Sequence, residues 1–281
     1  MRLLVTLLAV AAALWLLVRV AEPRLAFFPF EGEQITPARL GLRFDAVDVV
    51  TSDGETLRAW WLPAGRRAPQ VVYFHGNGGN LSMWSEVLAG LHRRGLSVLA
   101  LDYRGYGLST GRPSEQGLYR DAVATASLFH ARFRDENAPV VYWGRSLGAA
   151  VAAWAAREIP PDGVILESGF PDVHTLLRGN PVLWALAWLS SYRFPTATWM
   201  QEVRVPVLVL HGDADEVVPY AAGRALHARL GPRARFVTLP GGTHNEAEPP
   251  EAEAYWREIE AFVGSLPVGG RARGPAPSTN N

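Results

Sequence analysis

Cysteine and lysine are both missing from this chain of 281 residues. Without cysteine the protein has no disulfide, no thiolate metal ligand and no cysteine nucleophile. Without lysine, all 27 basic residues are arginine, which a GC-rich genome explains as well as any function does. They are balanced by 27 acidic residues, so the formal net charge is zero and no basic excess favours nucleic acid as a partner.

What the chain does contain is ample material for a core. Hydrophobic residues make up 48% of it, and its length suits one large domain, or one domain with an appendage. The end of the chain, "GGRARGPAPSTNN", is rich in glycine, proline and polar residues. We therefore expect a folded domain over residues 25–266 and a flexible tail over residues 267–281.

Residues 3–18, "LLVTLLAVAAALWLLV", carry no charge and lie between Arg2 and Arg19. As a helix they span roughly 24 Å, and the stem of Arg19 helps to reach the full hydrocarbon thickness of about 30 Å. A cleaved signal peptide is the rival interpretation, but cleavage after Ala21 would put an arginine at an unfavourable position. We expect residues 1–24 to form a single-pass membrane anchor, and the flanking arginines do not decide which side carries the domain.

Between about residues 44 and 264, short apolar runs alternate with amphipathic stretches. A hairpin is expected around Asp53 and Gly54. The apolar runs that follow lie at 70–75, 97–102, 139–144, 162–168, 205–212 and 235–240. The amphipathic stretches lie at 82–94, 115–133, 147–157, 219–230 and 249–264. This alternation predicts an α/β fold with a mostly parallel central sheet flanked by helices.

One interval, residues 169–204, is longer than the others and contains "NPVLWALAWLSSYRF". Inserts at the carboxyl ends of strands lie over the ligand crevice of such sheets, so we expect a small lid here. Trp184 and Trp188 are one helical turn apart in it. They either line a slot for an acyl chain, dip into the membrane interface, or simply cover the core.

Two stretches, 107–111 and 144–148, fit G-x-S-x-G, the pattern of a serine nucleophile held on a sharp turn. Ser146 follows the strand-like "PVVYW" and precedes "LGAAVAAWAAR", which is rich in helix formers. Strand, turn and helix form the context that the motif requires. Ser109 is followed instead by "TGRPSE", a loop. We predict Ser146 as the nucleophile and interpret the stretch around Ser109 as a glycine-rich connection.

A serine hydroxyl needs a base to remove its proton, and the base needs a carboxylate to orient it. His244 lies in the glycine-rich loop "PGGTHNE" after the last strand, from which an imidazole can reach back over the sheet edge. We predict it as the base, with His174 in the insert as the alternative. The other histidines lie on helical stretches or at strand ends.

The acid is expected in "HGDADEVVP", after the preceding strand, which offers Asp213, Asp215 and Glu216. Spacing does not separate the two aspartates. Glu167, at the end of another strand, is a weaker rival.

Two N–H groups should stabilise the oxyanion of an acyl-transfer reaction. Leu147, which follows Ser146 at the start of a helix, supplies one. We expect the other from Asn77 in the loop "HGNGGN" (75–80). That loop has neither the lysine of GxxxxGK[ST] nor the spacing of GxGxxG, which disfavours a nucleotide site. We expect no metal and no organic cofactor.

Five stretches together resemble the alpha/beta-hydrolase fold family, and in particular its membrane-anchored members, which include depalmitoylases and lysophospholipid lipases. They are "FHGNGGN", "LDYRGYGLSTGRPSEQGLYRDA", "GRSLGAAVA", "LHGDADEVVP" and "GGTHN", and the resemblance covers roughly residues 25–265. It implies Asp215 as the acid and a structural role for the turn that contains Ser109. It also implies hydrolysis of acyl esters or thioesters, without fixing the acyl donor.

The sequence thus predicts a serine hydrolase that cleaves carboxylic esters or thioesters of hydrophobic, lipid-like acyl substrates through an acyl-enzyme intermediate. Its predicted site is Ser146, Asp215 and His244, with the backbone N–H groups of Asn77 and Leu147. The alternatives are a serine peptidase on the same fold and a non-catalytic membrane-bound binding protein. The oligomeric state is left open.

Overall fold

The computed structural model describes residues 2–179 and 181–268. Within them, an eight-stranded sheet has the order β10-β9-β8-β7-β4-β6-β3-β2. Neighbouring strands in this sheet run parallel, except for the antiparallel pairs β2–β3 and β3–β6. The strands are β2 (Asp45–Val50), β3 (Thr56–Leu62), β4 (Gln70–Phe74), β6 (Ser97–Leu101), β7 (Val140–Arg145), β8 (Gly163–Glu167), β9 (Val207–Gly212) and β10 (Ala234–Leu239). The predicted α/β fold with a mostly parallel sheet is confirmed.

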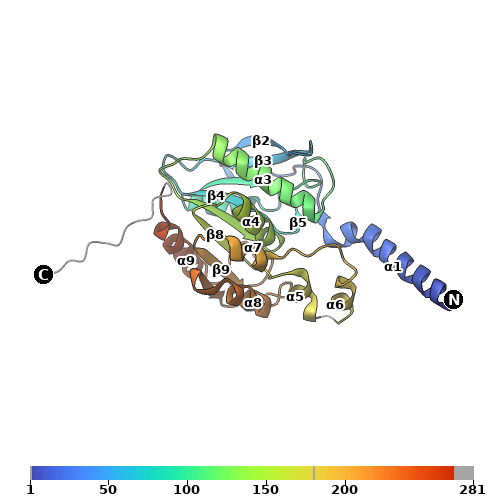
Figure 1. The fold of residues 1–281 in the computed structure, drawn as a ribbon. Coiled ribbons are helices and arrows are strands. Elements are labelled where there is room, and N and C mark those ends of the chain that lie inside the picture. Colours follow the sequence, from blue (N-terminus) through green and yellow to red (C-terminus); the bar gives the residue numbers. More distant parts are fainter. Residues whose placement is uncertain (1, 180, 269–281) are drawn as a thin grey trace.

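Helices cover both faces of this sheet (Figure 1). One layer contains α3 (Glu115–Arg132), α4 (Leu147–Glu158), α7 (Thr196–Glu202) and α8 (Tyr220–Leu230). The other contains α2 (Ser85–Arg93) and α9 (Ala252–Ser265). Alternate residues of β4 serve the two layers, since Val72 and Phe74 pack into the first core and Val71 and Tyr73 into the second. This is why the buried strands are apolar without interruption.

A further pair of very short strands was not predicted from the sequence. β1 (Phe28–Pro29) pairs in parallel with β5 (Gly78–Gly79) outside the main sheet. Strands of two residues are too short to show a period. The pair nevertheless fixes the beginning of the domain against the loop that follows β4.

The insert at 169–204 divides into two parts. Its first part contains α5 (Val173–Leu176), a 3-10 turn (Leu177–Gly179) and α6 (Pro181–Ala187). Residues 181–185 of α6 are exposed, whereas Ala197, Trp199 and Met200 of α7 are buried. We call residues 173–179 and 181–193 the projecting segment, and its helices α5 and α6 stand out from the domain (Figure 1). The lid expected over residues 169–204 stays a prediction, and α7 within that interval is part of the buried helix layer.

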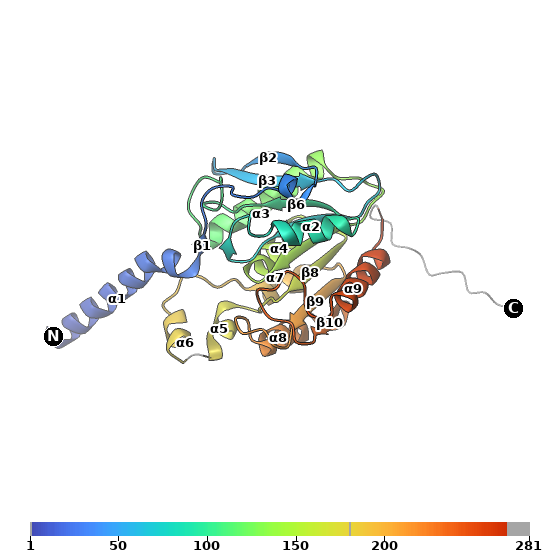
Figure 2. The ribbon, with the colours of Figure 1, turned by 180° about the vertical axis from the view of Figure 1, so that it is seen from behind.

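Helix α1 (Arg2–Ala26) extends away from the domain, as the two opposite views show (Figures 1 and 2). It is long and apolar enough to cross a membrane. Of the predicted tail, residues 269–281 lie outside the described part of the chain.

Candidate active site

Ser146 lies between β7 and α4 with φ 55° and ψ −119°, a backbone conformation that non-glycine residues rarely adopt. The turn is also very tight. A Cβ atom on Gly148 would lie 1.9 Å from the carbonyl oxygen of Phe74, and one on Gly144 would lie 2.0 Å from the carbonyl oxygen of Gly148. Both glycines of the motif are therefore sterically required, and the strained turn presents the serine at the carboxyl edge of the sheet.

The side chains of Ser146, His244 and Asp215 form a continuous chain of hydrogen bonds. The Nε2 atom of His244 lies 3.1 Å from the Ser146 Oγ, and its Nδ1 lies 2.8 Å from Asp215 Oδ2. All three residues are at least 91% buried. With the proton on Nδ1, the imidazole donates to the carboxylate and its Nε2 accepts from the serine hydroxyl. This arrangement places a base within reach of the serine proton.

Asp215 is held as a carboxylate by its surroundings. Burial alone would raise its pKa, but the hydrogen bond and charge of His244 oppose this effect. The N–H groups of Val217 and Val218 also donate to Asp215 Oδ1, at 3.0 and 2.7 Å. Together these partners lower the pKa of Asp215 below its ordinary value.

The other acidic candidates have different partners. Asp213 Oδ1 accepts from the N–H of Gly241 at 2.7 Å and so stabilises the turn after β10. Glu216 Oε2 accepts from the backbone N–H of His244 at 3.3 Å, a contact with the loop and not with the imidazole. Glu167 Oε2 accepts from the indole N–H of Trp143 at 2.9 Å. Of the four, Asp215 is the one hydrogen-bonded to the His244 ring.

The alternative base and the second serine also have other partners. The His174 ring packs against Trp188, with ring centroids 4.7 Å apart, in the projecting segment. The Ser109 hydroxyl donates to the Asp102 carbonyl at 2.8 Å and accepts from the N–H of Arg58 at 2.9 Å. It thus ties the turn after β6 to β3.

Arg145, for which the sequence predicts no role, is the residue immediately before Ser146. Its Nη2 donates to the backbone carbonyls of His244 at 2.8 Å and Glu246 at 2.5 Å. Its Nε lies 3.7 Å from Glu167 Oε1. Burial alone would lower the pKa of Arg145, but Glu167, Asp215 and two nearby tyrosines together raise it above its ordinary value. The sequence shows only an arginine inside the G-x-S-x-G motif, and its contact with the His244 loop depends on the tertiary fold.

The loop after β4 lies directly against the Ser146 turn, since a Cβ on Gly148 would also approach the His75 carbonyl to 2.6 Å. In this loop, the Asn77 side chain donates to the Ala26 carbonyl at 2.7 Å, where α1 ends. Tyr106 OH donates to the Asn77 carbonyl at 2.9 Å. Leu147 is the first residue of α4, where helical N–H groups have no partner within the helix.

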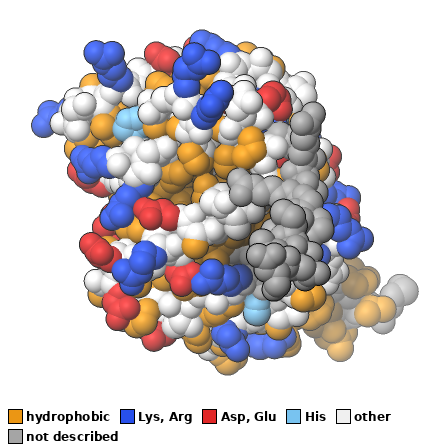
Figure 3. All heavy atoms as spheres, turned by 90° about the vertical axis from the view of Figure 1, so that its left-hand side faces the viewer, with side chains coloured by type: hydrophobic (Ala, Val, Ile, Leu, Met, Phe, Trp, Pro, Cys, Tyr) orange, Lys and Arg blue, Asp and Glu red, His pale blue; other side chains and the backbone are white. Residues whose placement is uncertain are grey.

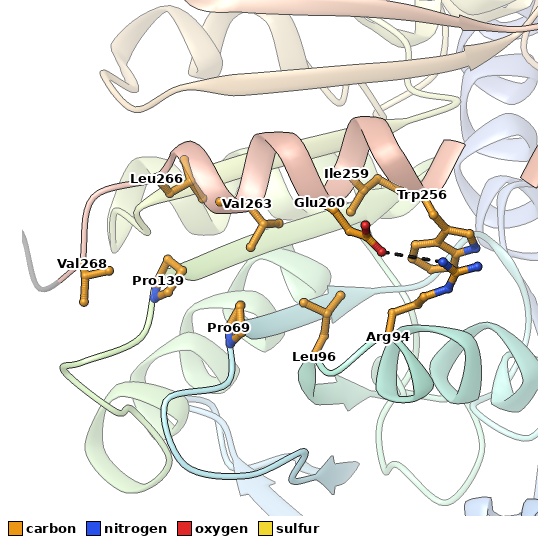
Figure 4. Close-up of a pocket in the computed structure, with 11 residues that line it drawn as sticks. Pro69, Arg94, Leu96, Pro139, Trp256, Ile259, Glu260, Val263, Leu266 and Val268 are labelled. Atoms are coloured by element: carbon orange, nitrogen blue, oxygen red, sulfur yellow. Dashed lines mark ion pairs between the residues drawn. The ribbon is translucent and has the colours of Figure 1, made fainter. Parts of the chain in front are cut away.

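A groove of about 290 Å³ lies at the amino ends of the strands, on the side of the sheet away from Ser146. Figure 4 shows apolar side chains of α9 along it and the ion pair of Arg94 with Glu260, at 3.6 Å. Pro69 and Pro139 in its wall precede β4 and β7, so the groove lies at the amino ends of strands whose carboxyl ends meet at Ser146. Figure 3 views this side, with hydrophobic side chains gathered near its middle. The groove is not part of the site around Ser146.

Within the described residues, no group of three or more histidine and acidic side chains is arranged to hold a metal ion.

Comparison with known proteins gives consistent matches. A model of the serine aminopeptidase S33 family matches residues 65–202 and 196–247. The uncharacterized protein Rv2307c of Mycobacterium tuberculosis is 34% identical over 252 residues, 89% of this chain and 90% of that protein. The alpha/beta hydrolase domain-containing protein WAV2 of Arabidopsis thaliana is 31% identical over 250 residues, 82% of this chain and 81% of its own. Lysophosphatidylserine lipase ABHD12 of Rattus norvegicus is 34% identical over 188 residues, 60% of this chain and 47% of that protein.

Solved structures share the fold at lower sequence identity. The esterase Pf2001 of Pyrococcus furiosus superposes with a TM-score of 0.69 and 18% identity, covering 85% of this chain and 97% of that chain. An alpha-beta hydrolase of Vibrio vulnificus superposes with a TM-score of 0.66 and 21% identity, covering 82% and 83%.

Proposed function

This chain belongs to the alpha/beta-hydrolase family, whose relatives include esterases and lipases, and from that premise we propose that it is a serine hydrolase. The bond it cleaves is the carboxylic ester or thioester of a hydrophobic acyl substrate. The observation that carries the proposal is the buried chain of hydrogen bonds from Asp215 through His244 to the Ser146 hydroxyl.

In the first step, His244 takes the proton from Ser146 as Oγ attacks the acyl carbonyl carbon. The carboxylate of Asp215, kept ionised by its lowered pKa, stabilises the imidazolium that forms. His244 then protonates the departing alcohol or thiol, and the acyl group remains on Ser146. In the second step, water gives its proton to His244 and attacks the acyl-enzyme, which releases the carboxylic acid and restores the serine.

The negative charge on the carbonyl oxygen needs donors in both steps. We assign them to the backbone N–H groups of Leu147, at the start of α4, and of Asn77, in the loop packed against the Ser146 turn. Loss of one such donor typically costs about 3 kcal/mol of transition-state stabilisation. The Tyr106 and Ala26 contacts of Asn77 support this role because they hold the loop in place before substrate arrives.

The preference for hydrophobic acyl groups rests on two apolar features, helix α1 and the projecting segment. Helix α1 is apolar and long enough to be a single-pass anchor, and Trp184 and Trp188 are exposed in the projecting segment. One relative is named as a lysophosphatidylserine lipase, which supports an acyl ester of lipid type as the substrate class.

A serine peptidase is the second candidate, because the matching family model is that of serine aminopeptidases. The same three side chains can attack an amide carbonyl. Turnover of aminoacyl p-nitroanilides above that of p-nitrophenyl esters would select this candidate.

The matched G-x-S-x-G stretches provide the test. Ser146→Ala should lower ester turnover by about a million-fold, because the members of such a constellation act as a unit. Ser109→Ala should retain near-normal turnover, since that hydroxyl bonds only to the backbone of Asp102 and Arg58. Turnover of p-nitrophenyl butyrate and covalent labelling by a fluorophosphonate are the measurements. Labelling of the Ser146→Ala protein at the normal rate would refute the assignment.

A further inference from the structure

The projecting segment presents large apolar side chains to solvent beside the root of α1. Trp188 is 64% exposed and Val182 is 68% exposed, with Leu183 and Trp184 also exposed between them. The two tryptophan rings pack edge to face, with centroids 6.2 Å apart. Exposed tryptophan with aliphatic neighbours is the composition that proteins place at the boundary between headgroups and acyl chains.

The residues that join α1 to the domain, which we call the root of α1, are also apolar and mostly exposed. Phe28 and Phe30, which follow the helix directly, are both more than half exposed. Figures 1 and 2 agree that α6 and the root of α1 stand on the same side of the domain. We call the set Phe28, Phe30, Val182, Leu183, Trp184 and Trp188 the docking surface.

A buried carboxylate joins α1 to the projecting segment. Glu22 accepts hydrogen bonds from the N–H of Ser191 at 3.0 Å, from the Ser191 hydroxyl at 2.5 Å and from the Ser190 hydroxyl. Glu22 is 8% exposed, although most of the described side chains of α1 are exposed to solvent. A carboxylate with three donors from one short stretch fixes the direction in which the helix leaves the domain.

Aromatic packing extends this connection into the domain. Phe27 lies edge to face with Tyr192, with ring centroids 5.2 Å apart. The Glu115 carboxylate of α3 accepts from the backbone N–H groups of Arg193 at 2.6 Å and Phe194 at 2.9 Å. The stretch from Ser190 to Phe194 thus binds α1 on one side and α3 on the other, so helix and domain hold a fixed mutual orientation.

Positively charged side chains near the docking surface complement the negative charge of anionic lipid headgroups. Arg19 and Arg24 of α1 and Arg178 in the 3-10 turn after α5 are exposed. The acidic Glu22 between the first two is turned inward onto Ser190 and Ser191. Arginine around an apolar surface favours a bilayer with anionic headgroups.

We propose that the docking surface lies in the interface of the same phospholipid bilayer that α1 enters, held there by the Glu22 connection. The inference rests on the proposed function in one respect, because it makes the substrate an acyl ester that resides in that bilayer. An apolar surface of this kind could instead bind a second copy of the chain or another protein, and the experiment separates these occupants.

The natural absence of cysteine makes the surface directly measurable. Trp188→Cys or Val182→Cys in the full chain, labelled with a nitrobenzoxadiazole fluorophore, is reconstituted in phosphatidylcholine–phosphatidylglycerol vesicles. The matched control is Val50→Cys in β2, which is 69% exposed and on the far edge of the sheet. We expect doxyl-labelled lipid to quench the label at 188 and at 182 but not at 50. Equal accessibility of all three labels to an aqueous quencher would overturn the proposal.

A label at 188 that is protected from water without quenching by the doxyl lipid, increasingly so at higher protein density, would overturn it in favour of a protein partner.

The Glu22 connection is tested by Glu22→Ala. Losing hydrogen bonds to a charged group should shift the docked population about tenfold. Quenching at 188 and turnover of a vesicle-embedded acyl ester should fall accordingly, while turnover of soluble p-nitrophenyl acetate should not change. Unchanged quenching in Glu22→Ala would refute the connection. A wild-type protein that docks but hydrolyses neither ester would refute the proposed function alone.

Discussion

The guanidinium of Arg145 donates a hydrogen bond of 2.8 Å to the backbone carbonyl of His244. The same nitrogen donates to the carbonyl of Glu246, two residues further on. Arg145 therefore forms two hydrogen bonds with the backbone of the His244 loop, while its own backbone leads into the Ser146 turn. Through this contact, the residue before Ser146 sets the position of His244 relative to it.

We predict that Arg145→Met lowers kcat by about a hundred-fold, because small displacements of a catalytic group cost that much. KM should change little, since Arg145 is not expected to touch substrate. The single variant also leaves Glu167 buried without its ion-pair partner, which destabilises by about 3–5 kcal/mol.

The double variant Arg145→Met, Glu167→Gln separates the two effects. It removes the orphaned charge, so thermal unfolding should return toward that of the parent protein while kcat stays low. Recovery of kcat together with stability would show that Arg145 is purely structural.

Gly148→Ala should abolish ester hydrolysis and destabilise the fold, because its Cβ would meet the Phe74 carbonyl at 1.9 Å. The control is Gly264→Ala in α9, where nothing lies within 4 Å of the added atom. There alanine should stabilise by up to about 1 kcal/mol through its helix propensity. Urea unfolding and p-nitrophenyl ester turnover measure both variants. A stable, active Gly148→Ala protein would contradict the tight turn.

Asp215→Asn should lower kcat by about 10⁴-fold, because the amide no longer holds the imidazole in its working tautomer. Asp213→Asn should remain within a few-fold of the parent, because an asparagine oxygen still accepts from the N–H of Gly241. Steady-state kinetics of the two single variants decide between the aspartates. The reverse ranking would move the acid to Asp213.

The lowered pKa of Asp215 also predicts a pH dependence of stability. A carboxyl whose pKa is lower in the folded state contributes stability above its unfolded value of about 3.9. That contribution is lost as pH falls through the folded value. On acidification below about pH 4, the free energy of unfolding should therefore fall more steeply for the parent than for Asp215→Asn. Parallel curves from denaturant titrations at each pH would count against the shift.

The sequence predicted the strands and helices of this fold well because buried parallel strands are continuous apolar runs. It also favours Ser146 over Ser109 as the nucleophile, since a helix begins directly after Ser146 and a loop follows Ser109. Two relationships depend on tertiary contacts that no local pattern encodes. Asp213 and Asp215 differ in which one the β10 loop brings to His244, and Arg145 acts on a residue far along the chain.

The projecting segment was harder to predict for a related reason. Trp184 and Trp188 have the same spacing whether they face a core, an acyl chain or a lipid surface. Only the position of α6, away from the buried α7, shows that these rings are not core residues.

The Asn77 side chain donates a hydrogen bond to the Ala26 carbonyl and so connects the end of α1 directly to the loop beside Ser146. A helix that crosses a bilayer changes its tilt when the bilayer thickens or thins. If α1 crosses a bilayer and the chain is the hydrolase proposed above, a change of tilt acts directly on Asn77, and the rate of hydrolysis should then depend on lipid chain length.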